Sequence, residues 1–347
     1  MCGFAGEIRF DGREADLAAI QRMSETMRPR GPDGGGTWQR GPLALAHRRL
    51  TIIDLTRAGE QPMVDSELGL SLAFNGCIYN YPELRRELEA HGYRFFSTSD
   101  TEVILKAYHR WGTDCVHRFM GMFAFAIAER ETGRVVLARD RLGKKPLYLA
   151  RGPGRLRFAS TLPALVAGGE VDASIDRTAL HHYLSFHSVV PAPHTILAGV
   201  RKLPPATVAV IEPDGSERTQ LYWRPSFVRP QQPLSAGAWR EAVLDRLRTA
   251  VKRRLVADVP IGVLLSGGLD PVTPPAYGDE VAKTLRNSRH VVAAGYGHNV
   301  SPHACAPRLV ADFIEQAGFD KLSPTCVRHF AQSTRPPMWP DRLSPRP

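Results

Sequence analysis

Two short stretches of this sequence carry residues whose types and spacing could do chemistry. The first is MCGFAG at the start, where Cys2 becomes the first residue if Met1 is removed. Its thiol would then lie beside an α-amino group of pKa about 7.7–8.0, which can act as a base at neutral pH. This arrangement is that of an N-terminal nucleophile, although a cysteine at position 2 is equally compatible with no chemical role.

The second stretch is LLSGGLD at 264–270, a glycine turn after an apolar run. Such a turn typically opens a helix, whose free N–H groups and dipole favour a bound phosphate. Here, however, Pro271, Pro274 and Pro275 follow. Proline lacks an N–H group and disfavours helix at the residue before it. The sequence therefore predicts a phosphate loop without its usual helix.

Composition excludes several classes of protein. The 347 residues are enough for two domains, and 43% hydrophobic with 23% charged residues is typical of a soluble globular chain. No apolar run approaches the roughly 18 residues of a membrane span, and the first residues show no signal peptide. Five scattered cysteines fit a reducing compartment better than a disulfide framework. We therefore expect a cytoplasmic protein without membrane contact.

The net charge of +10 raises the question of nucleic acid. The 45 basic and 35 acidic residues are interspersed, and no basic stripe with interleaved aromatic residues is present. The cluster VKRR at 251–254 lies at a predicted helix end and favours a solvated helix face. No nucleic-acid partner is predicted.

The elements that position these residues are read from periodicity. Up to about residue 210, four short apolar segments indicate strands: LALAHRRLTIIDL, LSLAFNGCIYN, MFAFAIAE and RVVLARD. Two helices lie between them: YPELRRELEAHG, which ends at Gly92, and DTEVILKAYHRWG, which starts on a capping Asp100 and ends at Gly112. This mixture predicts an α+β domain over 1–215 with sheets packed face to face.

A proline-rich linker is expected over 216–236. The stretch 237–270 then begins with AWREAVLDRLRTAVKRRLVADV, an amphipathic helix with four apolar residues on one side: Leu244, Leu247, Val251 and Leu255. The segment IGVLLSGG follows as a buried strand and a glycine turn. Together they predict the opening of a second, α/β domain.

The composition changes again at 271. Within 271–325, YGDEVAKTL and APRLVADFIEQAG indicate helices and RHVVAA a strand, whereas 326–347 is too rich in proline to pack and is expected to be disordered. The strands IGVLL (261–265) and RHVVAA (289–294) are separated by enough chain for a parallel crossover. A truncated, parallel-sheet α/β fragment is therefore predicted.

Six motifs over residues 1–270 give the chain a family resemblance. They are MCGFAG, RGPDGGG, AHRRLTIIDL, FNGCIYNYPELRRELEAHGY, SDTEVILKAY and RDRLGKKPLYLA, in that order. The set closely resembles the glutaminase domain of class II glutamine amidotransferases, specifically the asparagine synthetase family. That resemblance implies a four-layer αββα N-terminal-nucleophile fold for 1–215 and hydrolysis of glutamine to supply ammonia for ATP-dependent amide formation.

The resemblance also implies roles for individual residues. Cys2 would attack the side-chain amide of glutamine and form a thioester. Asn75 and the backbone of Gly76 would form the oxyanion hole. Arg49 would hold the α-carboxylate of glutamine, and Asp100 would pair with its ammonium group. Taken singly, Asn75-Gly76 could instead be a hairpin turn, Asp100 a helix cap and Arg49 a surface charge.

Cys77 is a departure from the family, many of whose members have an acidic residue at this place in the glutamine site. A main-chain contact there would survive the change, and Cys77 could otherwise be a small buried residue. FNGCIYNY, together with 180–208, looks most like the branch that amidates N-acetylglutaminylglutamine. The sequence does not fix the acceptor of the amide, which could be the precursor of asparagine or a dipeptide of this type. A homodimer is compatible with the resemblance.

In the family, the glycine loop binds the pyrophosphate of ATP with Mg²⁺. The corresponding residues here are Leu264 on the adenine side and four loop residues: Ser266, Gly267, Gly268 and Asp270. Pro271 replaces a serine, and nothing further downstream resembles the synthetase domain. We therefore expect a vestigial ATP site and a glutaminase without its synthetase step.

The downstream part resembles something else, the C-terminal part of tripeptidyl-aminopeptidase-like α/β-hydrolases. By that resemblance Asp270 would be a triad acid, His298 a triad base, and Cys305 and Cys326 a disulfide pair. The required nucleophile motif G-x-S-x-G is nowhere upstream. We interpret the chain as a fusion at the shared pentapeptide SGGLD. A hydrolase fragment and a non-functional fusion remain the alternatives to an amidotransferase.

Overall fold

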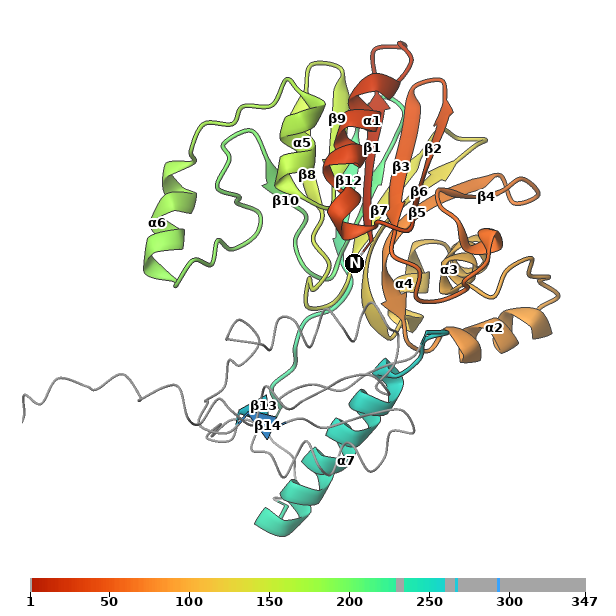
Figure 1. Ribbon diagram of the computed structural model, residues 1–347, viewed down its shortest axis with the longest axis vertical. Coiled ribbons are helices and arrows are strands. Elements are labelled where there is room, and N and C mark those ends of the chain that lie inside the picture. Colours follow the sequence, from red (N-terminus) through yellow and green to blue (C-terminus); the bar gives the residue numbers. More distant parts are fainter. Residues whose placement is uncertain (1, 229–233, 260–265, 268–291, 294–347) are drawn as a thin grey trace, which may run out of the picture. The chain divides into compact units, whose positions relative to one another are not determined.

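The computed structural model describes residues 2–228, 234–259, 266–267 and 292–293 of the chain (Figure 1). The chain divides into two compact units, Met1–Asp258 and Val259–Pro347. The helices of the described part are α1 (Leu17–Thr26), α2 (Tyr81–Ala90), α3 (Asp100–Trp111), α4 (Cys115–Arg118), α5 (Leu162–Gly168), α6 (Arg177–Ser185) and α7 (Ala236–Arg254). None of these helices is both long and apolar enough to cross a membrane.

The first unit contains two antiparallel sheets of six strands each. The first sheet has the order β10-β8-β9-β1-β3-β2, with β10 (Arg201–Lys202), β8 (Tyr148–Gly152), β9 (Arg155–Ala159), β1 (Gly3–Arg9), β3 (Leu43–Arg49) and β2 (Gly34–Arg40). The second has the order β12-β11-β7-β6-β5-β4, with β12 (Glu217–Leu221), β11 (Thr207–Ile211), β7 (Val135–Arg139), β6 (Gly121–Glu129), β5 (Leu70–Ile78) and β4 (Met63–Asp65).

The two sheets pack face to face and share one apolar core. Phe4 and Ile8 of β1 meet Ala124 of β6 and Leu137 of β7 in this cluster, and all four are almost fully buried. Small alanines alternate with larger side chains here, which lets two twisted sheets approach closely. The central strands are buried on both faces, because helices cover the side of each sheet that faces away from the other.

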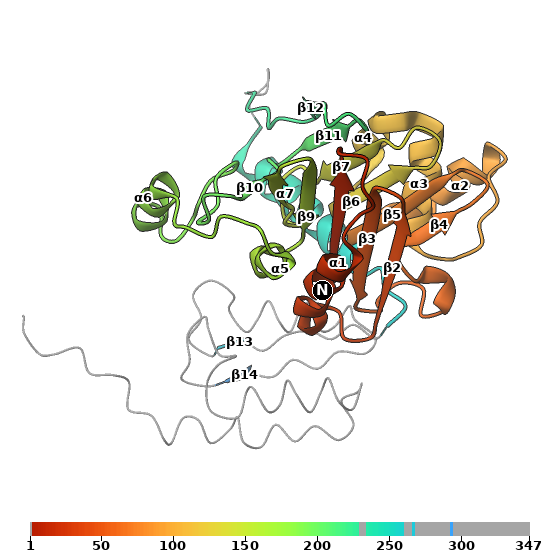
Figure 2. The same cartoon turned by 90° about the horizontal axis from the view of Figure 1, so that it is seen from above.

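Helices form the two outer layers (Figures 1 and 2). On the first sheet, Ile20 and Met23 of α1 and Leu165 of α5 pack against Ala46 and Ala159. On the second sheet, side chains of α2, α3 and α4 pack against the outer face of β5 and β6. The predicted four-layer α+β architecture is therefore confirmed, while α6 projects to one side of the sheets in both views.

The predicted start of α3 needs correction. The N-cap of α3 is Ser99, whose hydroxyl accepts the Thr101 N–H bond, and Asp100 is already the first helical residue. Serine is as good a cap as aspartate, so the cap moves by one residue and leaves the Asp100 carboxylate for another partner. The predicted end of this helix is confirmed, since Gly112 closes it with a φ of 57°.

The expected linker over 216–236 is only partly irregular. Its start forms β12, which pairs along its whole length with β11 and completes the second sheet. The amphipathic helix is present as α7, but three of the four side chains expected on its packed side are exposed: Leu244 is 41%, Leu247 57% and Val251 48% exposed, while Leu255 is half-buried. No described residue packs on this side of α7 closely enough to bury it.

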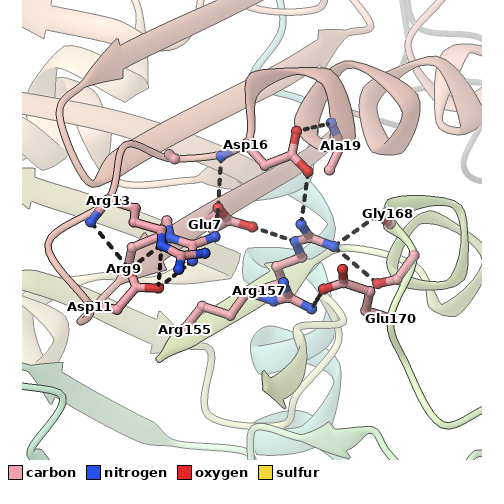
Figure 3. A network of polar contacts seen from close by, with 12 residues as sticks. Glu7, Arg9, Asp11, Arg13, Asp16, Ala19, Arg155, Arg157, Gly168 and Glu170 are labelled. Atoms are coloured by element: carbon pink, nitrogen blue, oxygen red, sulfur yellow. Dashed lines mark hydrogen bonds and ion pairs between the residues drawn. The ribbon is translucent and has the colours of Figure 1, made fainter. Parts of the chain in front are cut away.

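A buried ion pair fixes the first sheet to its helices (Figure 3). Glu7 of β1 and Arg157 of β9 lie side by side at 2.5 Å, with side chains 0% and 3% exposed. Glu7 also accepts the backbone N–H bond of Asp16, the N-cap of α1, at 2.8 Å. Arg157 donates to the carbonyl of Gly168, at the end of α5, at 2.8 Å. The pair therefore ties β1, the strand that follows Cys2, to both outer helices.

Of the second unit, the structure describes only β13 (Ser266–Gly267) and β14 (Val292–Ala293), which pair in parallel. Val292 and Ala293 belong to the predicted strand RHVVAA (289–294), while its predicted partner IGVLL (261–265) lies outside the described residues, so that pairing stays a prediction. Ser266 and Gly267, expected in a phosphate loop, are strand residues here because their backbones pair with β14. Leu264, Gly268, Asp270 and His298 lie outside the described residues, as do Cys305 and Cys326.

Candidate active site

One cavity of about 160 Å³ brings together the six residues predicted for the glutamine site: Cys2, Arg49, Asn75, Gly76, Cys77 and Asp100. They come from the residue before β1, the end of β3, the second half of β5 and the first turn of α3. Pockets for drug-sized ligands are about 300–1,000 Å³, so this cavity suits a single small amino acid. Residues up to 98 positions apart in the sequence thus converge on one site.

Cys2 lies immediately before β1. Its Sγ accepts the Leu50 N–H bond at 3.3 Å and lies 3.6 Å from the Leu50 carbonyl oxygen. Burial raises the pKa of this thiol, and the Leu50 hydrogen bond, the chain's α-amino charge and the Lys145 ammonium group oppose the rise. The surroundings therefore hold the thiol in place and supply positive charge that favours the thiolate.

Asn75 is the residue whose side chain most directly indicates a ligand. It is 1% exposed, yet neither its amide nitrogen nor its amide oxygen has a hydrogen-bond partner among the described residues. A buried unpartnered amide is costly, so native proteins retain one where a ligand completes it. The alternative of a hairpin turn is wrong, because Asn75 and Gly76 lie within β5 opposite Ala124 and Phe123 of β6.

Gly76 is required by its neighbours rather than by its backbone angles. A Cβ atom there would lie 2.2 Å from the Met122 carbonyl oxygen and 2.5 Å from the Phe74 ring. The adjacent backbone is also fixed: Gln61 Oε1 accepts the Phe74 N–H bond at 2.6 Å, and His47 Nε2 donates to the Phe74 carbonyl at 3.0 Å. Burial lowers the pKa of His47 to about 3, so the ring is neutral and Nε2 carries the proton.

Arg49 is 9% exposed, so the alternative of a surface charge is wrong. Its guanidinium group donates to the carbonyls of Thr56 at 2.9 Å, Ile53 at 3.3 Å and Asp54. Gly59 permits this close approach, since a Cβ atom there would lie 2.4 Å from Arg49 Nη2. Three hydrogen bonds thus attach Nη1 and Nη2 to one loop, and the Nε–H donor, which makes none of the three, would be left for a ligand carboxylate.

Asp100 is almost fully buried, and one carboxylate oxygen accepts the Ile78 N–H bond at 2.9 Å. Burial raises its pKa to about 7, against the effect of the backbone hydrogen bonds. A carboxylate with this pKa is poised to ionise when a cation arrives. Its position at the cavity, rather than at a helix cap, fits the role that the resemblance implied.

Cys77 lies beside Asn75 and Gly76 on β5 and lines the same cavity. Burial, and after it the Asp100 carboxylate, raise its pKa to about 12. At neutral pH it is therefore a neutral thiol. The Lys145 charge opposes the rise for both thiols, but only for Cys2 do the Leu50 hydrogen bond and the α-amino charge also oppose it.

Lys145 is a site residue that the sequence reasoning missed. It lies in the loop between β7 and β8, is 4% exposed and lines the cavity with Cys2. Burial lowers its pKa, and the thiols of Cys2 and Cys77 are among the groups that oppose this. The motif LGKKP was recognised, but only the structure distinguishes Lys145 from its exposed neighbour Lys144.

The nucleotide site predicted from the glycine loop is not assembled by the described residues. Ser266 and Gly267 are extended strand residues, and the other expected ligands lie outside the described part. Within that part there is also no cluster of three or more side chains suited to a metal ion. Most of the predicted ATP ligands lie outside the described residues, and we derive no step through ATP or Mg²⁺.

Two antiparallel sheets between helical layers, with a half-buried cysteine immediately before a central strand, define the N-terminal-nucleophile fold. The chain belongs to the Glutamine amidotransferase domain family, which matches residues 1–223. A second family, described as TAP-like protein, matches residues 242–326. The predicted resemblances to an amidotransferase and to a hydrolase tail are both confirmed.

Curated relatives include two asparagine synthetases [glutamine-hydrolyzing] of Bacillus subtilis (strain 168). Number 3 is 34% identical over 274 residues, covering 78% of this chain and 44% of the relative. Number 1 is 36% identical over 299 residues, covering 85% of this chain and 46% of the relative. The chain spans about half the length of these relatives. Among solved structures, glutamine phosphoribosylpyrophosphate amidotransferase from B. subtilis is 18% identical, with a TM-score of 0.49, covering 84% of this chain and 66% of that one.

Proposed function

We propose that this chain hydrolyses glutamine to glutamate and ammonia, with Cys2 as the nucleophile. The observation that carries the proposal is the unpartnered amide of Asn75, which faces the same small cavity as the Cys2 thiol. A thiol nucleophile next to a buried, unused hydrogen-bond donor is the pairing that attack on an amide carbonyl needs.

The first half of the reaction forms a thioester. After removal of Met1, the α-amino group of Cys2 takes the proton of the thiol, and the Lys145 ammonium group favours the thiolate. The sulfur attacks the side-chain carbonyl carbon of glutamine, and the C=O π electrons move to oxygen. Asn75 Nδ2 and the Gly76 backbone N–H would donate to this oxyanion. Collapse breaks the C–N bond, and the departing nitrogen takes the proton and leaves as ammonia.

The second half regenerates the enzyme. Water attacks the thioester carbonyl with the α-amino group as base, the same donors stabilise the second oxyanion, and the C–S bond breaks. Glutamate then leaves and the thiol of Cys2 is restored, so the overall balance is glutamine plus water to glutamate plus ammonia. Arg49 would hold the α-carboxylate of the substrate through its charge and its Nε–H donor, and ionised Asp100 would pair with the α-ammonium group.

The ATP-dependent half-reaction, amide formation on an acceptor, is not expected of this chain. Adenylating a carboxylate requires a nucleotide, a metal and an acceptor held together, and the sequence after Asp270 departs from the family that does this. The identity of the acceptor therefore stays a prediction about the family branch and not about this chain. The two acceptors considered are the precursor of asparagine and a dipeptide of the N-acetylglutaminylglutamine type.

Hydrolase chemistry by the TAP-like part is the second candidate, favoured by the family match over 242–326. Asp270 and His298 would supply an acid and a base. The full sequence has no G-x-S-x-G motif to supply the nucleophile. We therefore place the activity of this chain at Cys2.

The test is release of ammonia from glutamine by the purified full-length chain, with and without ATP and Mg²⁺. We expect release in both conditions, without formation of AMP. Release that requires ATP, together with AMP and an amide product, would contradict the restriction to glutaminase activity. Ester or peptide cleavage without ammonia release would favour the hydrolase instead.

A further inference from the structure

Asp258 is the last residue of the first unit and lies beyond the 1–223 match to the amidotransferase family. It follows α7, yet it contacts a loop some 200 positions earlier. Its backbone N–H donates to the Ile52 carbonyl at 2.9 Å, and its carboxylate Oδ2 accepts the Asp54 N–H bond at 2.7 Å. Two hydrogen bonds therefore attach the segment after α7 to residues 52–54.

This loop belongs to the glutamine site. Ile52, Ile53 and Gly59 line the cavity with Cys2, and the carbonyls of Ile53, Asp54 and Thr56 hold the Arg49 guanidinium group. Whatever fixes the backbone at Asp54 therefore also fixes the direction of the arginine expected to bind the substrate.

The backbone at Asp54 does not hold its shape by intrinsic preference. Its φ is +55°, in the left-handed region that costs a non-glycine residue about 1–2 kcal/mol. Its carboxylate accepts N–H bonds from Thr56 at 3.0 Å and Thr98 at 2.8 Å, which fixes the side chain. The Asp54 N–H bond to Asp258 fixes the backbone itself, so the conformation depends on a residue outside the family domain.

A second contact at the same end of α7 strengthens the attachment. The Arg254 guanidinium carbon lies 5.2 Å from the centre of the Tyr79 ring, a cation–π distance, and Tyr79 directly follows β5. The segment 254–258 thus reaches both the end of the strand that carries Asn75 and the loop that holds Arg49.

We propose that Asp258 is a positioning residue of the glutamine site, which it serves by holding the 52–56 loop and, through the Asp54 carbonyl, the Arg49 guanidinium group. This proposal rests on the proposed glutaminase function. Asp258 touches no substrate in this account, so its loss should weaken glutamine binding more than it slows the chemical step. The glutamine site is then completed by the chain that follows the glutaminase domain.

Three variants of the full-length chain test this. Asp258→Ala removes the acceptor, Asp258→Asn keeps an acceptor oxygen of the same shape, and Asp245→Ala removes an exposed aspartate of α7 whose partner is Arg248. We expect Asp258→Ala to raise the KM for glutamine roughly five- to tenfold, since a hydrogen bond to a charged acceptor is lost, with kcat within about twofold. Asp258→Asn and Asp245→Ala should stay within about twofold of wild type in both constants.

Hydrogen–deuterium exchange of the 50–59 segment separates this proposal from the proposed function. The backbone amides of this segment should exchange at least several-fold faster in Asp258→Ala than in Asp245→Ala, whether or not the chain releases ammonia. Equal exchange in the two variants would overturn the proposal. So would a fall in kcat and in melting temperature with KM unchanged, because that describes a general structural role. A wild-type chain that releases no ammonia would instead contradict the proposed function and leave the exchange comparison to decide the role of Asp258.

Discussion

Replacing Asn75 with alanine should separate activity from stability. If the Asn75 amide donates to the oxyanion, its removal should lower kcat for glutamine about 100- to 1,000-fold, or about 2.7–4 kcal/mol of transition-state stabilisation. KM should change little, because this donor is used mainly when charge develops on oxygen.

The effect on stability should have the opposite sign or be close to zero. Two buried polar atoms of Asn75 have no partner among the described residues, and each such atom costs a protein roughly 1–3 kcal/mol. The alanine removes both atoms and enlarges a cavity that already exists, so the added packing loss is small. We expect the free energy of unfolding to stay within about 1 kcal/mol of wild type or to rise.

Asn80 provides the matched control just beyond the same strand. Its amide donates to the Arg118 carbonyl at 3.0 Å and accepts the Met120 N–H bond at 2.8 Å. Asn80→Ala should therefore lower the free energy of unfolding by about 1–2 kcal/mol and leave kcat within about threefold. Ammonia release and urea unfolding measure the two quantities. If Asn75→Ala keeps kcat within threefold of wild type, or lowers the free energy of unfolding by more than about 2 kcal/mol, the oxyanion role is refuted.

Two further predictions concern buried charges. Burial raises the pKa of Asp100 to about 7, and the ionised form pairs with the substrate ammonium. Ionisation of Asp100 should therefore contribute about a tenfold rise in kcat/KM between pH 6 and 8, in addition to the rise from deprotonation of the α-amino base; in a pH series, Asp100→Asn should lose the first contribution and keep the second. The same raised pKa favours the folded state most below about pH 4, and this contribution should be lost as the pH rises through 7, measured as the difference from Asp100→Asn in urea unfolding. Glu7→Ala removes the closer of the two carboxylates that pair with the buried Arg157, the other being Asp16, and should cost about 3–5 kcal/mol of unfolding free energy. Glu25→Ala, which removes the exposed partner of Arg28 and Arg48, should cost less than about 1 kcal/mol; equal losses would contradict the role of the buried pair.

The sequence predicted the layers and most of the site because both depend on local patterns. Apolar alternation revealed the strands, and the motifs around Cys2, Arg49, Asn75 and Asp100 stand in an order that matches a known family. Local patterns also produced the errors. An aspartate before a helix predicts a cap, but the preceding Ser99 took that place and left Asp100 to the cavity.

Residues that act through long-range contacts carry no such signal. Lys144 and Lys145 are adjacent and chemically identical, and only the fold buries one of them beside Cys2. Asp258 reaches Asp54 across 204 positions, which no periodicity or motif encodes. The exposed apolar side of α7 shows the converse: amphipathic spacing predicted a packed side, but spacing cannot name the partner that would cover it.

The central claim is that Cys2, freed of Met1, hydrolyses glutamine. Ammonia release by wild type, Cys2→Ala and Cys115→Ala, with N-terminal sequencing of each, tests it most directly. Cys115 is a buried core cysteine outside the cavity, so its loss tests thiols in general. We predict that the active wild-type chain begins at Cys2, that Cys2→Ala releases no ammonia above background, and that Cys115→Ala keeps at least half the rate. Release by Cys2→Ala at the wild-type rate, or full activity in a chain that retains Met1, would contradict the account.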